Sequence, residues 1–251
     1  MKKRTLNCIG ILFSLLIVTG LAQADVYMKQ KQHSDGMKVM GKQQPAEDVI
    51  ANIWITDKGF RSDNPKNSMI MLLDKKTMIM IDHKKKTYTE MPLDMGDMMS
   101  KKSKDMDAED RAAFQKMMQG MMKMEVSVQP TGEKKKIKDW NCKKYIMTLE
   151  TFMGPTTNEI WATEDLKMDM DLYAKFNSSM MAAMPGMKNA ADQMMKEMKK
   201  IKGVQVLNIS TMNIMNQTTK STTELLDFKK GKAPSGIFKV PSGYKKKSIT
   251  E

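Results

Sequence analysis

The sequence is poor in the side chains that most often carry catalysis, because its 251 residues include only two histidines and two cysteines. Cys8 lies in an apolar run near the N-terminus, and Cys142 is the other cysteine. Cys8 belongs to a segment with the pattern of a cleavable signal peptide, so the mature chain would keep only Cys142. A single cysteine cannot form an internal disulfide, a CxxC redox pair or a cysteine-based zinc site. His33 and His83 stand in polar turn surroundings without a partner pattern, and the nucleophile-elbow, HExxH, P-loop and dinucleotide-binding glycine motifs are missing. We therefore expect a protein that is not an enzyme and that needs no cofactor or metal.

The first 24 residues predict a cleavable secretory signal peptide. A basic start, Lys2 to Arg4, precedes an apolar run from Ile9 to Leu21, and small residues stand at the cleavage position in Ala22 to Ala24. Crossing a bilayer as a helix takes roughly 20 apolar residues, more than this run offers. We expect cleavage before Asp25 and a periplasmic location.

The chain is strongly basic, with a net charge of +13. Loss of the signal would remove three of the 42 basic residues and none of the 29 acidic ones, which leaves +10. Such a surface attracts nucleic acid, anionic membranes or acidic polymers, and export argues against nucleic acid. The lysines form runs at 84–86, 134–136 and 245–247, each of which is expected at a turn or tail.

The remaining chain predicts one domain of antiparallel strands over residues 25–245, followed by a charged tail at 246–251. Short apolar stretches are parted by turn residues, with hairpin turns expected at Asp57–Gly59 and Gly154-Pro155. Residues 69–73 and 78–81 are apolar without alternation, which indicates strands covered on both faces, by helices or a ligand as well as the core.

Two segments show helical rather than strand periodicity. Residues 95–124 repeat apolar side chains every three or four positions. A second helical region begins near Leu166 or Asp171 and ends near Ile201, and Pro185-Gly186 predicts a break within it. Strands return at 204–215 and 218–228 as a final hairpin.

Methionine is the most unusual feature of the composition, with 31 residues against seven phenylalanines. Thioethers suit Cu(I), and close pairs such as Met168 and Met170, or Met184 and Met187, have spacings compatible with copper ligation. The alternative is that methionine serves as a flexible apolar filler. The methionines are spread along strands and helical stripes instead of clustering with histidines, which favours apolar lining.

Several stretches resemble the DUF4412 family of exported bacterial proteins. They are residues 69–82 followed by 86–92, Cys142–Tyr145 leading to Asn158–Thr163, and the closing Phe238–Tyr244. The family is similar in organisation to the periplasmic lipoprotein-binding proteins LolA and LolB. The resemblance implies an α+β fold, an open antiparallel β half-barrel whose two amphipathic, methionine-rich helical insertions pack on its concave side. In the carriers a basic residue stands near the lid, the helical segment over the concave side. The resemblance makes Arg61 the candidate for this residue.

These observations lead to a binding protein that holds a lipid, an acyl chain or a lipidated partner, acting as a monomer. The expected lining residues are Trp54, Met69, Met71, Met78, Met80, Met118, Met121, Met180 and Met184. Two alternatives stay open. One is a periplasmic Cu(I)-binding protein, and the other is a basic structural protein that sits on an anionic envelope surface through its lysine runs.

Overall fold

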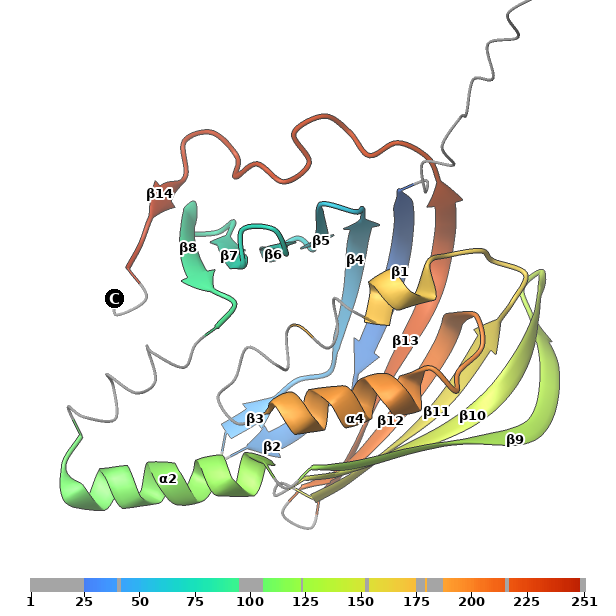
Figure 1. Cartoon of the computed structure of the whole chain (residues 1–251), viewed down its shortest axis with the longest axis horizontal. Helices are drawn as coiled ribbons and strands as arrows, with labels where there is room; N and C mark the ends of the chain where they lie inside the picture. Colours follow the sequence, from blue (N-terminus) through green and yellow to red (C-terminus); the bar gives the residue numbers. More distant parts are fainter. Residues whose placement is uncertain are drawn as a thin grey trace, which may run out of the picture.

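Most of the described chain is β-sheet, as Figure 1 shows. The computed structural model describes residues 25–39, 42–94, 106–122, 124–151, 154–174, 179, 187–214 and 217–248, so the predicted signal peptide lies outside the described residues. In chain order the elements are β1 (Val26–Ser34), β2 (Met37–Val39), β3 (Lys42–Gln44), β4 (Glu47–Ile55), β5 (Gly59–Asp63), β6 (Asn67–Leu72), β7 (Thr77–Asp82), β8 (Thr87–Pro92), α2 (Ala108–Met122), β9 (Glu125–Ile137), β10 (Trp140–Thr151), β11 (Gly154–Thr163), α4 (Lys188–Met198), β12 (Val204–Ile214), β13 (Gln217–Lys230) and β14 (Lys245–Lys246).

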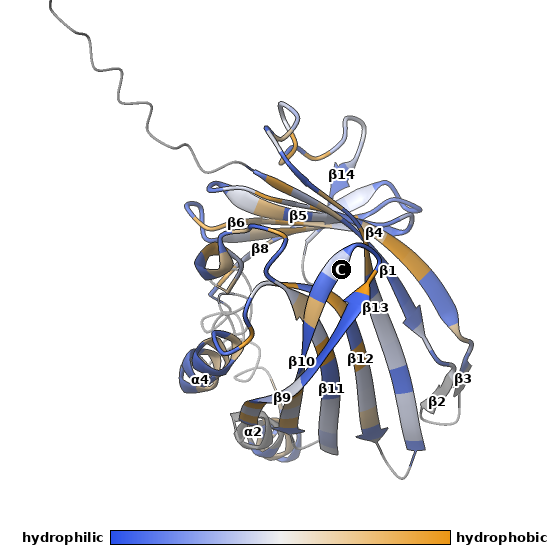
Figure 2. Cartoon of the chain, turned by 90° about the vertical axis from the view of Figure 1, so that its right-hand side faces the viewer, coloured by the Kyte–Doolittle hydropathy of each residue, from blue (hydrophilic) through white to orange (hydrophobic). Residues whose placement is uncertain are grey.

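One large open sheet contains 12 of these strands, in the order β14-β8-β7-β6-β5-β4-β1-β13-β12-β11-β10-β9. Its end strands, β14 and β9, are not neighbours, so the sheet does not close into a barrel. Figures 1 and 2 show that it is strongly curved. Neighbouring strands are antiparallel except for β14, which runs parallel to β8. The prediction of a mostly antiparallel, open sheet with few helices is confirmed.

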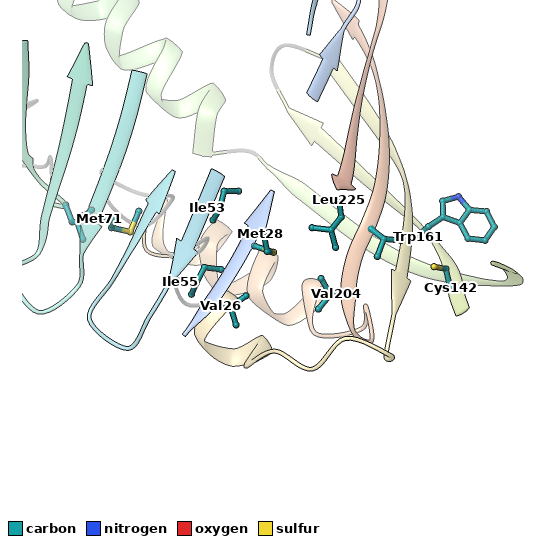
Figure 3. Close-up of a cluster of buried hydrophobic side chains, with 11 residues drawn as sticks. Val26, Met28, Ile53, Ile55, Met71, Cys142, Trp161, Val204 and Leu225 are labelled. Carbon is teal, nitrogen blue, oxygen red and sulfur yellow. The ribbon is translucent and has the colours of Figure 1, made fainter. Parts of the chain in front are cut away.

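The inner face of the sheet, on which residues 166–173 pack, carries the largest core cluster. The register aligns Val26, Ile55, Phe60, Met71 and Met78 in one row across five strands. Paired residues point to the same side of a sheet, so this row shares the inner face. Figure 3 shows the inner-face part of the cluster from Met71 past Met28 to Leu225, whereas the Trp161 ring lies on the other side of the strands. Complete burial of each such side chain stabilises the fold by about 1.5–3 kcal/mol.

The outer face of β5 to β8 is covered by residues 231–244, called the strap. Ile70, Ile79 and Ile81 are buried against strap residues that include Phe238 and Tyr244. The prediction that β6 and β7 are covered on both faces is confirmed for these isoleucines. The outer cover was expected to be a helix or a ligand and is instead this C-terminal segment, visible in Figure 1 as the red chain above the sheet.

The second lysine run lies inside a strand, so its prediction as a turn is wrong. Lys134–Lys136 belong to β9 and pair with residues 141–143 of β10. The turn falls at Lys138, whose Nζ donates a hydrogen bond of 2.6 Å to the carbonyl oxygen of Leu225 and pairs with Glu224 at 3.1 Å. A ribbon with exposed side chains needs no apolar alternation, and therefore this part of β9 carries no strand signal.

Helix α4 covers the free edge of β9. The carboxylate of Glu197 accepts a hydrogen bond of 2.7 Å from the backbone N–H of Val128, and the Gln193 amide donates one of 3.5 Å to the carbonyl of Val126. Glu197 and Gln193 are one helical turn apart, so both reach the same strand. An exposed strand edge invites pairing with other chains, and α4 occupies the first part of this one, at Val126 and Val128.

Both predicted helical regions are longer than the helices that the structure describes. Residues 95–105 of the first lie outside the described residues, and α2 accounts for 108–122. In the second, residues 170–174 are helical and α4 follows, whereas Pro185-Gly186 lies outside the described residues. Among the described residues, no helix has the length and apolarity needed to cross a bilayer.

Two predicted boundaries differ from the structure. Gly154-Pro155 was expected as a turn but begins β11, where Gly154 pairs with Thr151. Gly154 has φ +119°, and a Cβ there would lie 2.4 Å from the carbonyl oxygen of Asn213, so glycine is needed for close strand approach. At the other end, pairing with β8 extends to Lys247, past the predicted domain end at residue 245.

Candidate functional site

A cavity of about 370 Å³ lies between residues 168–174 and the stretch from Met194 to Gly203. Its volume falls in the range of about 300–1,000 Å³ that small-molecule sites occupy. Its lining includes five methionines, all half-buried: Met168, Met170, Met194, Met195 and Met198. We call this space the methionine cavity.

Two separate segments bring these thioethers together. Met194 and Met198 lie one turn apart on α4 and project from the same face of the helix. On the opposite wall the backbone is held by Asp169, whose carboxylate accepts a hydrogen bond of 2.9 Å from the N–H of Leu172. This is the hydrogen bond of a helix N-cap, and it places Met168 and Met170 at the start of a short helical turn.

The wall formed by the α4–β12 connection is fixed by backbone constraints. Gly203 has φ +92°, and a Cβ on it would lie 2.0 Å from the carbonyl oxygen of Thr163. The N–H of Lys202 donates a hydrogen bond of 3.2 Å to the hydroxyl of Tyr145. An ion pair of 3.1 Å between Lys199 and Asp171 joins the two walls, but both side chains are exposed, so it stabilises their contact by at most about 1 kcal/mol.

A second, smaller cavity of about 160 Å³ lies between residues Met168 and Tyr173 and the inner face of the sheet. Because both cavities contact Met168 and Tyr173, they lie next to one another. The floor of the smaller one carries neutral polar side chains beside apolar ones: Gln30, Gln205, Asn208 and Thr223, with Met28 and Leu225. We call it the lower cavity.

Asn208 stands out on this floor. Its Oδ1 is buried and has no hydrogen-bond partner among the described residues. Leaving a buried acceptor unsatisfied costs about 1–3 kcal/mol, so structures rarely keep such an atom without a reason. The lower cavity therefore offers a neutral polar floor beneath an apolar wall.

Four of the predicted lining residues share the inner face of β6 and β7. The register pairs Met69 with Met80 and Met71 with Met78. None of the four lines the methionine cavity: Met71 is a core residue with 1% exposure, whereas Met80 is 38% exposed. They form a separate group, and their contact with a ligand stays a prediction.

Trp54 does not belong to that group, because it lies on the outer face. It pairs with Arg61 of β5, and its ring lies 5.2 Å from that of Tyr27. Arg61 is bound to Asp63 and donates a hydrogen bond of 3.0 Å to the carbonyl of Lys239, so it anchors the strap and does not face a lid. Trp54 and the strand methionines cannot line one cavity.

The other four predicted residues are not placed. Met118 and Met121 belong to α2, but their side chains lie outside the described part of the chain, as do Met180 and Met184 altogether.

Sequence reasoning missed most of the cavity residues as a set. Met168 and Met170 were noted only as a close pair, and Met194 and Met198 only as part of a helical stripe. Met195 and Asn208 were not singled out. The signal that two stretches 20 residues or more apart form one cavity is absent from local periodicity, because their approach depends on where α4 packs on β9.

The ionisable side chains near the core include Cys142 and Glu197. Burial raises the pKa of the Cys142 thiol, whose residue is 1% exposed, so the thiolate is disfavoured despite the neighbouring lysines. A hydrogen bond from Lys200, with one from the backbone of Val128, lowers the pKa of Glu197. Within the described residues, no group of three or more histidine, cysteine, aspartate or glutamate side chains is placed to hold a metal ion.

Comparison with protein families gives a clear match. The family model described as "Domain of unknown function (DUF4412)" matches residues 54–244. No curated protein matches the chain.

Two of the solved structures that match show a distant likeness. An uncharacterized conserved protein from Thermus thermophilus has 7% identity and a TM-score of 0.46, with 91% of each chain covered. A putative outer membrane lipoprotein-sorting protein domain from Vibrio parahaemolyticus has 5% identity and a TM-score of 0.31, with 85% of this chain and 87% of that chain covered. At these TM-scores, neither likeness supports a role.

Proposed function

The chain belongs to the DUF4412 family, which is named only as a domain of unknown function, and we propose from its geometry that it is a non-enzymatic binding protein for acyl chains. The ligand is a lipid, a free acyl chain or a lipidated partner. It occupies the methionine cavity and extends towards the lower cavity. The observation that carries the proposal is the convergence of five half-buried methionines on one cavity.

Methionine suits such a ligand for a physical reason. Its unbranched side chain has three rotatable bonds and a polarisable sulfur, so a wall of methionines adapts to a flexible chain. The core of the sheet contains rigid β-branched residues such as Ile70 and Ile160 besides Met28 and Met71. Small-molecule sites combine apolar walls with a small number of polar or charged groups. The charged residues that line this cavity are Asp169, Asp171, Lys199 and Lys202.

We propose that the protein acts in the periplasm and that its sheet is organised as a half-barrel. The basic start, apolar run and small residues of positions 1–24 support export to the periplasm. The open, curved sheet with α4 along its edge is compatible with a half-barrel organised like LolA and LolB, in which helical segments cover the concave side.

Binding of a fluorescent fatty acid to the purified protein tests the proposal. Met170→Glu and Met195→Glu each place a charge in the cavity wall, and we expect each to weaken binding at least about tenfold, since burying an unpaired carboxylate is costly. Met80→Glu is the matched control, because Met80 is exposed and lies outside the cavity.

Two outcomes would count against the proposal. One is the lack of any binding by the unmodified protein, combined with no co-purifying lipid in native mass spectrometry. The other is a loss in Met80→Glu as large as in the cavity variants, which would move the ligand to the strand methionines.

A second candidate function is Cu(I) binding, favoured by the same five thioethers. Soft sulfur ligands select Cu(I), and the methionine cavity gathers five of them. The two candidates need different properties of the side chain, namely sulfur donors for copper and adaptable apolar volume for an acyl chain.

Leucine substitutions separate the two functions. A Met168→Leu, Met170→Leu, Met195→Leu variant keeps the cavity apolar and removes three sulfurs. Under the acyl-chain proposal it keeps fatty-acid binding within a few-fold. Under the copper alternative, anaerobic titration against a Cu(I) chelator shows tight binding by the unmodified protein and a large loss in the variant.

A further inference from the structure

Two of the three lysine runs, far apart in the sequence, meet at one corner of the molecule. β14 pairs with β8 in parallel, with Lys245 opposite Thr87 and Lys246 opposite Tyr88. The N–H of Lys245 donates a hydrogen bond of 3.0 Å to the carbonyl of Lys86. The turn at 83–86 and the strand at 245–247 therefore form one continuous basic surface, called the basic corner and located near β14 and β8 in Figure 1.

Most of this positive charge is not neutralised. All six lysines of residues 84–86 and 245–247 are exposed. Lys85 pairs with Asp82 at 3.5 Å, and Lys246 pairs with Glu90. Among the described residues, the other four lysines have no carboxylate within ion-pair distance: Lys84, Lys86, Lys245 and Lys247.

An exposed apolar side chain lies beside this charge. Met80 is the one exposed large hydrophobic residue of the part of the chain that the structure describes. It lines a groove of about 380 Å³ together with Met91, Tyr88, Lys85 and Lys247. The groove thus joins two methionines and a tyrosine to two lysines on one surface.

We propose that the basic corner docks the protein on an anionic lipid bilayer. The lysines face the phosphate groups, and Met80 enters the boundary between headgroups and acyl chains. Lysines near an anionic bilayer are each attracted to it, and a cluster of four uncompensated ones supports reversible binding. This docking surface goes beyond the acyl-chain proposal and does not depend on it.

The position of Met80 argues against a role in solubility alone. A surface that only keeps the protein soluble is best served by charges without an exposed large apolar neighbour. Lys134 and Lys136 fit that simpler role, because they are exposed on β9, at the opposite end of the strand order from β14 and β8. The chain therefore contains its own control for net charge.

Vesicle co-flotation tests the proposal with the full chain. The probes are phosphatidylcholine vesicles with and without phosphatidylglycerol, at low salt and at about 0.5 M salt, where exposed ionic contacts are screened. We expect binding only to the anionic vesicles. Lys84→Glu with Lys245→Glu should weaken it at least about tenfold, and Met80→Ser should weaken it several-fold.

The control is Lys134→Glu with Lys136→Glu, which changes the net charge equally at another place. Equal losses in the two double variants, or equal binding to both vesicle types, would overturn the proposal. Fatty-acid binding by the same variants separates this result from the proposed function, because none of the four lysines lines the methionine cavity. Circular dichroism verifies that each variant is folded.

Discussion

The two halves of the sheet differ in which of their faces is covered. In the half from β5 to β8, the strap covers the outer face, and Ile70, Ile79 and Ile81 are buried there. In the half from β9 to β13, Ile209 on the outer face is only half-buried, and the inner face adjoins two cavities. The strap covers the first half around these isoleucines, whereas the second half has the methionine cavity and the lower cavity on its inner side.

This difference explains why methionine has two roles in one chain. Met71, on β6 of the strap-covered half, is 1% exposed and fills the core. Met168 and Met195 lie on segments that cover the other half and stay half-buried around a cavity. Met71 differs from Met168 and Met195 in its position on a core strand, and not in residue type.

The largest expected loss of stability concerns the half of the sheet that the strap covers. Ile70→Ala removes a side chain with 0% exposure and should cost about 2–5 kcal/mol, because the strap and the neighbouring strands cannot fill the space. Ile209→Ala, on the same outer face of the other half, should cost clearly less. Urea unfolding of the two variants measures the contrast, and equal losses would refute the distinction between the halves.

A medium effect concerns the edge of β9. Glu197→Gln removes the charge that the carboxylate presents to Lys200 and to the N–H of Val128, and we expect a loss of about 1 kcal/mol at neutral pH. The lowered pKa of Glu197 means that its contribution is present above the ordinary glutamate pKa of about 4.3 and is lost as pH falls through the lower folded value.

Thermal melts of this variant from pH 7 down to pH 3 check the pH dependence. The Tm difference between Glu197→Gln and the unmodified protein should shrink as the solution becomes acidic. A difference that stays constant, or grows, over that range would show that the charge of Glu197 does not stabilise the edge.

The smallest effect compares two methionines. Met195→Leu, in the wall of the cavity, should change stability by no more than about 0.5 kcal/mol, as for most surface substitutions. Met71→Leu, in the core, should cost more, up to about 1.5 kcal/mol. Chemical unfolding distinguishes them, and a larger cost at Met195 would mean that the cavity wall is packed as tightly as the core.

The turn between β4 and β5 was predictable from the sequence, because Asp57–Gly59 carries a local turn signal. The turn expected at Gly154-Pro155 was misplaced, since these residues begin β11. Strand pairs with exposed side chains were harder, since Lys134–Lys136 lack any apolar alternation although they lie in β9. The strap was not foreseen as a cover, because its apolar residues are few and lie among prolines and glycines.

The methionine-rich character of the candidate site was predictable from the sequence, but the residues that form it were not. The excess of methionine favoured an adaptable lining, and the structure gathers five of these residues around one cavity. Their positions depend on the packing of residues 168–174 against α4, which no local pattern encodes. Trp54 was misplaced because a continuous apolar stretch does not reveal which face of a strand turns inward.

Methyl resonances of the methionines test the central claim most directly. With methionine labelled at its methyl carbon, titration of a fatty acid is followed by nuclear magnetic resonance. We predict that the signals of Met168, Met170, Met194, Met195 and Met198 shift, while that of Met71, which lines neither cavity, stays in place. Shifts confined to Met69, Met78 and Met80, or no shifts at all, would contradict a binding site in the methionine cavity.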